Sequence, residues 1–154
     1  MQIHSLELAD DFSLIGIHSS EEDYRLAFLL NQHLQTKFSI LKQQLDFHNN
    51  SASFSVFEFI DERCQLSYHL IANKFIGNTH LSAGPNLFST ENTFSNISYL
   101  IGEKKTVDFF LKIEGDISQY ELKKRIDQIK SISQVITSYK IDPKDLKSKD
   151  HLIF

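Results

Sequence analysis

Two carboxylates, Glu103 and Asp108, are the first candidates for chemistry in this sequence. They lie five residues apart in the stretch YLIGEKKTVDFFLKIEGD, residues 99–116. Two carboxylates can act as acid and base when their environments separate their pKa values. A spacing of five across a turn does not establish that the side chains face each other. The alternative places Asp108 on the solvent face of a strand, beside Lys112, and Glu103 in a hairpin turn.

Other sequence patterns that carry chemistry are absent. The seven histidines have no spacing typical of a metal site, and no hydrolase elbow or nucleotide-binding glycine motif occurs. Cys64 is the only cysteine, which excludes an internal disulfide and a cysteine-based metal site. The sequence therefore predicts no catalytic residues, no metal and no cofactor.

Size and charge restrict the classes of protein that remain. A chain of 154 residues suits one domain, predicted over 1–154. The formal net charge of −4 makes nucleic acid an unlikely partner, because nucleic-acid binders carry a basic excess. No apolar run is long enough to cross a membrane, and the first residues do not resemble a signal peptide. We expect a cytoplasmic protein.

The first half of the chain predicts a strand, a helix and further strands. Residues 12–17 form an apolar run typical of a buried strand. A helix follows, capped by Ser19 or Ser20 and ending near Thr36. Residues 37–47 alternate as a second strand, and residues 53–60 and 65–75 predict a pair of strands joined by a turn at DERC.

The polar segment 76–98 has no clear periodicity. It is rich in Asn, Ser and Thr, and a structureless loop of this length is uncommon inside a small domain. We expect a partly ordered excursion anchored by Leu87, Phe88 and Phe94.

The last third gives the clearest pattern. Residues 106–115 alternate as a strand with two faces, one of Val107, Phe109, Leu111 and Ile113 and the other of Asp108, Phe110, Lys112 and Glu114. A helix capped by Ser118 follows, with Glu121 in the capping-box position. A closing strand then ends at Asp142-Pro143, and residues 142–154 form a short solvated tail.

These elements predict a single α+β domain, a two-layer sandwich of two main helices on a largely antiparallel sheet of about six strands. Residues 11–24 and 108–120 share a strand, an acidic turn and a helix start with tyrosine in its first turn. This repeat suggests two ferredoxin-like or ACT-like halves that share one sheet, and coincidence explains it equally well.

Three separated blocks resemble the IPExxxVDY family of small bacterial proteins. The blocks are DYRLAFLLNQHL, LIGEKKTVDFFLKIEGD and YKIDPKDLKSKDHLIF, in that order. The motif that names the family reads Ile101-Gly102-Glu103, three residues, then Val107-Asp108-Phe109 here, with Gly102 in place of proline and Phe109 in place of tyrosine. The resemblance implies a bacterial cytoplasmic setting and transfers no catalytic residues, because the family has no characterised activity.

The function we expect from these observations is a non-enzymatic protein-interaction or regulatory module that binds another protein or associates with itself, for example as a homodimer. The predicted second sheet face carries Phe57, Phe59 and Phe110, which would suit a partner unless the helices or the 76–98 excursion cover them. The alternative is a small enzyme or small-molecule binder. Its pocket would lie near Tyr24, Arg25, Asn31, Glu103 and Asp108.

Overall fold

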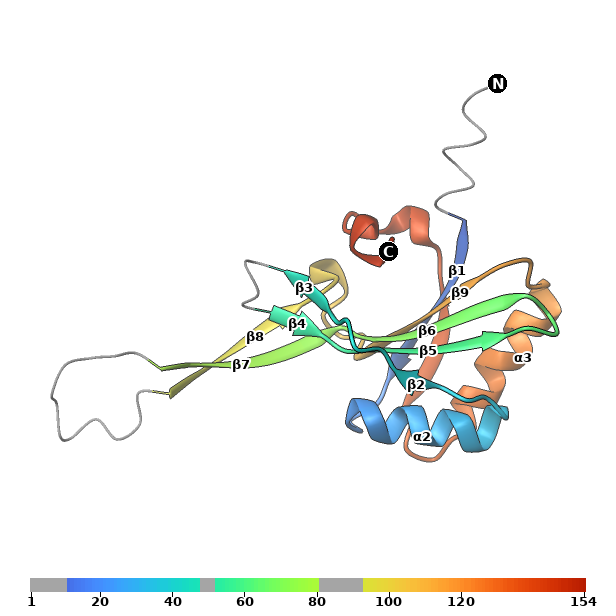
Figure 1. Cartoon of the computed structure of the whole chain (residues 1–154), viewed down its shortest axis with the longest axis horizontal. Coiled ribbons are helices and arrows are strands. Elements are labelled where there is room, and N and C mark those ends of the chain that lie inside the picture. The colour runs from blue at the N-terminus through green and yellow to red at the C-terminus, as the bar shows by residue number, and fades with distance from the viewer. Residues whose placement is uncertain (1–10, 48–51, 81–92) are drawn as a thin grey trace, which may run out of the picture.

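The computed structural model describes residues 11–47, 52–80 and 93–154 (Figure 1). The helices are α2 (Asp23–Leu34) and α3 (Gln119–Lys130). The strands are β1 (Phe12–His18), β2 (Ser39–Ile40), β3 (Leu45–Phe47), β4 (Ala52–Phe54), β5 (Val56–Asp61), β6 (Leu66–Ala72), β7 (Lys74–His80), β8 (Thr93–Tyr99), β9 (Phe109–Glu114) and β10 (Thr137–Ile141). Short 3-10 helices span Gly102–Lys104, Pro143–Asp145 and Lys149–Leu152.

The main sheet has six strands in the order β10-β1-β9-β6-β5-β2, and every neighbouring pair is antiparallel. β9 and β6 are therefore its two central strands. Both helices lie on one face of this sheet (Figure 1). The predicted α+β sandwich, with two main helices on a largely antiparallel six-stranded sheet, is confirmed.

The predicted division into two similar halves is not confirmed. The chain after β1 and α2 continues to β2, at the far edge of the sheet. The chain after β9 and α3 instead returns to β10, next to β1. The two strand–helix units therefore connect to the sheet in different ways.

The two helices begin in different ways. Ser118 caps α3 as predicted, since its side-chain oxygen accepts a hydrogen bond from the Glu121 N–H at 3.1 Å. α2 begins instead at Asp23 after Glu22, and no side chain caps it. The predicted cap at Ser19 or Ser20 is wrong, because Ser19 Oγ is used in the preceding turn.

The helix-covered face of the sheet forms the first hydrophobic core. Phe109, Leu111 and Ile113 of β9 point into it as predicted and pack with apolar residues of both helices. Val107 does not share their face, because β9 begins only at Phe109. Phe57 lies in this core as well, and Phe59 packs against it.

The opposite face of the sheet is also covered. Phe110 is fully buried there, in a second core that includes Phe54 of β4, Leu100 and Ile101. The predicted exposed aromatic face is therefore wrong: Phe57 and Phe59 lie under the helices, and other segments cover Phe110. Figure 1 shows the β3–β4 hairpin and the C-terminal 3-10 helices on this side of the sheet.

The segment after Asp142 is packed and not a solvated tail. Leu146 is buried, and Leu152 is fully buried in the second core. The Asp142 side chain accepts a hydrogen bond from the Lys144 N–H at 3.0 Å and so caps the 3-10 helix Pro143–Asp145. The tail therefore forms part of the cover on the second sheet face.

Two other predicted segments differ in detail. Residues 37–47 form two short strands, β2 and β3, in different sheets and not one strand. The predicted excursion at 76–98 contains a two-stranded antiparallel ribbon, β7–β8, that projects from the body (Figure 1). Leu87 and Phe88, two of its predicted anchors, lie outside the described residues, and so does the side chain of Phe94.

None of the helices in the described part of the chain is long and apolar enough to cross a membrane.

Candidate functional site

One buried amide, that of Asn73, holds the root of the ribbon. Asn73 is the single residue between β6 and β7 and is completely buried. Its side-chain nitrogen donates to the carbonyl oxygens of Lys104, at 2.9 Å, and Val107, at 2.8 Å. Its side-chain oxygen accepts from the Ile101 N–H at 2.8 Å. The side chain thereby fixes the loop that joins β8 to β9.

The backbone of Asn73 is fully used as well. Its N–H donates to the Asp108 carbonyl at 3.0 Å, and its carbonyl accepts from the Leu100 N–H at 2.9 Å. Since β6 continues into β7 and the loop between β8 and β9 is held against the junction, the ribbon extends the β6–β9 pair. Its two strands therefore leave from the centre of the sheet.

Asp108 joins this root to the turn after β1. One carboxylate oxygen accepts from the Ser19 N–H at 2.8 Å, and the other lies 4.0 Å from Lys74 Nζ. The Asp108 N–H donates to the Ile17 carbonyl at 3.0 Å. Asp108 is thus a half-buried residue of the loop before β9, not a surface charge on the strand.

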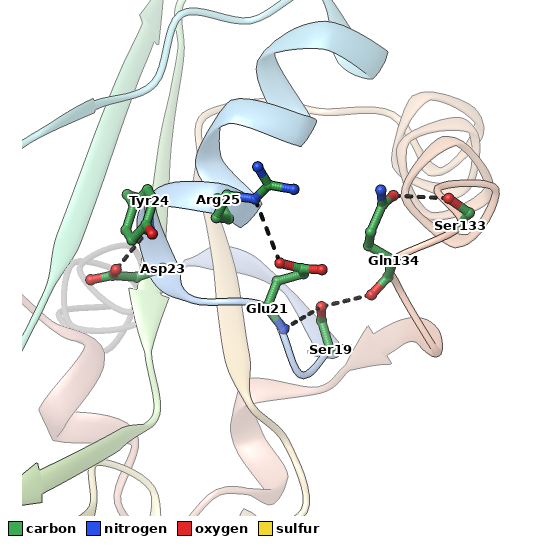
Figure 2. Close-up of polar contacts among 7 residues, drawn as sticks. All are labelled: Ser19, Glu21, Asp23, Tyr24, Arg25, Ser133 and Gln134. Atoms are coloured by element: carbon green, nitrogen blue, oxygen red, sulfur yellow. Dashed lines mark hydrogen bonds and ion pairs between the residues drawn. The ribbon is translucent and has the colours of Figure 1, made fainter.

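Polar contacts within the turn that leads into α2, and one contact with the distant Gln134, stabilise this turn (Figure 2). Ser19 Oγ donates to the Gln134 carbonyl at 2.8 Å and accepts from the Glu21 N–H at 3.2 Å. Arg25 Nε lies 3.7 Å from a Glu21 carboxylate oxygen, one helical turn away. The Asp23 carboxylate accepts from the Tyr24 N–H at 2.7 Å.

A groove of about 950 Å³ lies between this turn and the root of the ribbon. Residues 19–23 line one side, Lys74 and Ile76 line the ribbon side, and Asp108 also borders the groove. Its lining carries the four carboxylates of Glu21, Glu22, Asp23 and Asp108 and one cation, Lys74. The groove is therefore acidic, with an apolar wall formed by the ribbon.

Two exposed isoleucines lie next to this groove on the ribbon. Ile76 of β7 and Ile97 of β8 are directly paired across the strands. Ile76 is 61% exposed and Ile97 is 51% exposed. A cross-strand apolar pair normally stabilises a sheet by being covered. In the described part of the protein this pair has little cover.

Glu103 holds the C-terminal segment. Its carboxylate accepts from the Ser148 N–H at 2.7 Å and from the Ser148 hydroxyl at 2.9 Å. Glu103 is exposed, and the slight desolvation of its carboxyl raises the pKa, but its hydrogen bonds outweigh that effect and hold the pKa below its ordinary value. Glu103 and Asp108 thus bind different parts of the chain, and nothing pairs them as an acid and a base.

The predicted pocket residues do not come together at this groove. Of Tyr24, Arg25, Asn31, Glu103 and Asp108, only Asp108 lines the groove. Asn31, near the end of α2, accepts from the Phe38 N–H at 2.7 Å and donates to the Phe38 carbonyl at 3.2 Å, so it stabilises the chain that leaves the helix. The side chains of Tyr24 and Arg25 are largely exposed.

A second polar cluster was not predicted from the sequence. Lys112, expected on the solvent face, is only 2% exposed, and it is paired across β9 and β6 with His69, which is 7% exposed. Glu58 and Glu114 lie beside them. Strand alternation correctly placed Lys112 on the face of β9 opposite Phe109, Leu111 and Ile113. No local signal shows that the distant Phe154 covers Lys112 and His69.

The comparisons with known proteins add no relative. No protein family, no curated protein and no solved structure matches this chain.

Proposed function

We propose that this protein is a non-enzymatic interaction module that binds another protein through the β7–β8 ribbon and the groove at its root. The observation that carries this proposal is the exposed pair of Ile76 and Ile97 on a ribbon that is firmly held at its base. The resemblance to the IPExxxVDY family and the single cysteine support a bacterial cytoplasmic setting as part of the proposal.

The exposed pair favours a protein partner for an energetic reason. A two-stranded ribbon alone is marginally stable in water, and its free edges invite pairing. Covering the two isoleucines would remove apolar surface from water at about 25 cal/mol per Å². A ribbon that is held by Asn73 loses little conformational freedom on binding, which favours affinity further.

The charges of the groove indicate the chemistry of the partner. Arg25 offsets Glu21 and Lys74 lies beside Asp108, which still leaves an excess of carboxylates in the groove that would repel an acidic segment and attract a basic one. The partner segment therefore combines apolar residues, which cover Ile76 and Ile97, with lysine or arginine residues that enter the groove. Such binding weakens as the salt concentration rises, because exposed charges are screened.

The test is affinity purification from cells of the source organism, with the wild-type protein and the double variant Ile76→Ser/Ile97→Ser. We expect a partner that the wild type retains at low salt and that the double variant loses. The control is Tyr120→Ser on α3, which removes a large exposed side chain away from the groove and should keep the partner. A partner that the double variant retains as well as the wild type would contradict the proposal.

Self-association is distinguished in the same experiment by sedimentation of the purified protein. A dimer that the double variant disrupts would show that the partner is a second copy of this chain. If the purified wild-type protein is a monomer and the double variant still loses the captured partner, the partner is a different protein.

A further inference from the structure

The second polar cluster contains a cation that is buried beneath aromatic rings. Lys112 Nζ lies 4.0 Å from the centre of the Phe154 ring and 5.3 Å from that of Phe12. It also lies 3.1 Å from a carboxylate oxygen of Glu114. A cation over a ring face is an attractive contact that strengthens when water is excluded. The surface above Lys112 therefore favours the binding of an aromatic ring through a cation–π contact.

His69, which is paired with Lys112 across the strands, has a ring nitrogen, Nδ1, without a hydrogen-bond partner. Its Nε2 lies 2.9 Å from a carboxylate oxygen of Glu58, which can only accept, so Nε2 carries the hydrogen. In the neutral ring Nδ1 is then an acceptor. Nδ1 is buried without a hydrogen-bond partner, and the Glu114 oxygen 3.8 Å away is another acceptor. Buried polar atoms rarely remain in this state.

Phe154 occupies this surface but does not complete it. Its ring meets the His69 ring edge-on, with 5.2 Å between the centroids, and a phenyl ring has no donor for Nδ1. Phe154 is 48% exposed and Ile153 is 42% exposed, whereas Leu152 before them is fully buried. Leu152 therefore anchors the segment, whereas the side chains of Ile153 and Phe154 are much less enclosed.

We propose that the surface over Lys112 and His69 is a binding site for a phenolic ring. The ring replaces Phe154 over Lys112, and its hydroxyl donates a hydrogen bond to His69 Nδ1. Glu58 and Glu114 disfavour an aromatic acid at this position, so the ligand group is a neutral phenol. Phe154 occupies the site in the structure and competes with the ligand for it. This proposal is independent of the ribbon.

The experiment measures the binding of p-cresol, the tyrosine side-chain analogue, by NMR with ¹⁵N-labelled histidine. We expect the Phe154→Ala protein to bind p-cresol roughly tenfold more tightly than the wild type, because no resident ring has to be displaced. Binding should shift the ¹⁵N resonance of His69 Nδ1. Toluene, which lacks the hydroxyl, should bind more weakly and leave that resonance in place.

A second variant places the donor in the chain itself. Phe154→Tyr should shift the Nδ1 resonance without any ligand and bind p-cresol no better than the wild type. A capped Gly-Tyr-Gly peptide distinguishes the sources of the phenol: binding of both probes indicates a tyrosine side chain, and binding of p-cresol alone indicates a small molecule.

Two results would overturn the proposal. One is a wild-type protein in which Nδ1 already carries a hydrogen at neutral pH, since Nδ1 is then a donor and cannot accept a hydrogen bond from a phenol. The other is equal binding of toluene and p-cresol to the Phe154→Ala protein, which would show an apolar cavity only.

Discussion

Two buried polar clusters lie close together along the chain, one at His69 within β6 and one at Asn73 directly after it, and they differ in how completely their hydrogen-bonding groups are paired. At the end of the strand, the side chain of Asn73 makes three hydrogen bonds and its backbone makes two more. Four residues earlier, His69 leaves one ring nitrogen without a partner. A satisfied buried network rigidifies a fold, whereas an unsatisfied one invites an additional group. The cluster at Asn73 therefore stabilises the fold, and we assign the cluster at His69 to the proposed binding of a phenol.

The largest effect should come from breaking the satisfied cluster. Asn73→Ala removes the hydrogen-bond partner of the Ile101 N–H and of the Val107 carbonyl, and leaves the Lys104 carbonyl with only the Val107 N–H, so we expect a loss of about 3 kcal/mol in the free energy of unfolding. Urea unfolding measures this loss. Ser133→Ala, which removes one exposed hydrogen bond between neighbouring residues, is the control and should change little. A cost below about 1 kcal/mol for Asn73→Ala would mean that the junction is not the rigid element.

A smaller effect is expected at the second cluster, although it contains a buried charge. Lys112→Met keeps most of the side-chain volume and leaves Glu114, which is 42% exposed, in contact with water. Removing one partner of an ion pair is costly when the other charge stays buried, but Glu114 remains hydrated, so we expect a change below about 1 kcal/mol. Lys124→Met on the exposed side of α3 is the matched control. A loss as large as that of Asn73→Ala would erase the distinction between the clusters.

The smallest effect concerns Glu103, which connects the loop held by Asn73 to the segment that carries Phe154. Glu103→Gln should cost a few tenths of a kcal/mol near neutral pH, because the group is exposed and screened. Folding lowers the pKa of Glu103 from 4.5, so the carboxylate stabilises the folded protein above that pH and ceases to do so as the pH falls below it. The difference between wild type and variant should therefore disappear in acid. Unfolding curves at several pH values measure it, and a difference that grows in acid would contradict this assignment.

The sequence predicted those parts of the fold that depend on local pattern. The alternation of Phe109, Leu111 and Ile113 identified the helix-covered face, and Ser118 with Glu121 identified the start of α3. Ser19 misled because a serine before an acidic turn is a good cap, while here Gln134, which is distant in sequence, binds its hydroxyl. Local pattern does not contain such a partner.

The candidate sites were less predictable for the same reason. Alternation placed Phe110 and Lys112 away from the helices but could not show that other segments cover them. Asn73 looked like an ordinary polar residue within a strand, because its importance depends on Ile101, Lys104 and Val107 in a loop about thirty positions later. Asp108 and Glu103 were identified as notable, and their partners, Ser19 and Ser148, were not.

The position of the ribbon has a mechanical consequence. β7 continues from β6, and β8 is joined to β9 through the loop of residues 100–108 that Asn73 holds. β6 and β9 are the two strands in the middle of the sheet, and each has a hydrogen-bonded neighbour on both sides. A pull along the ribbon would load these ladders in shear, so that many hydrogen bonds share the force and do not open one after another. A force that a bound partner exerts along the ribbon would thus be resisted by the hydrogen-bond ladders on both sides of β6 and β9.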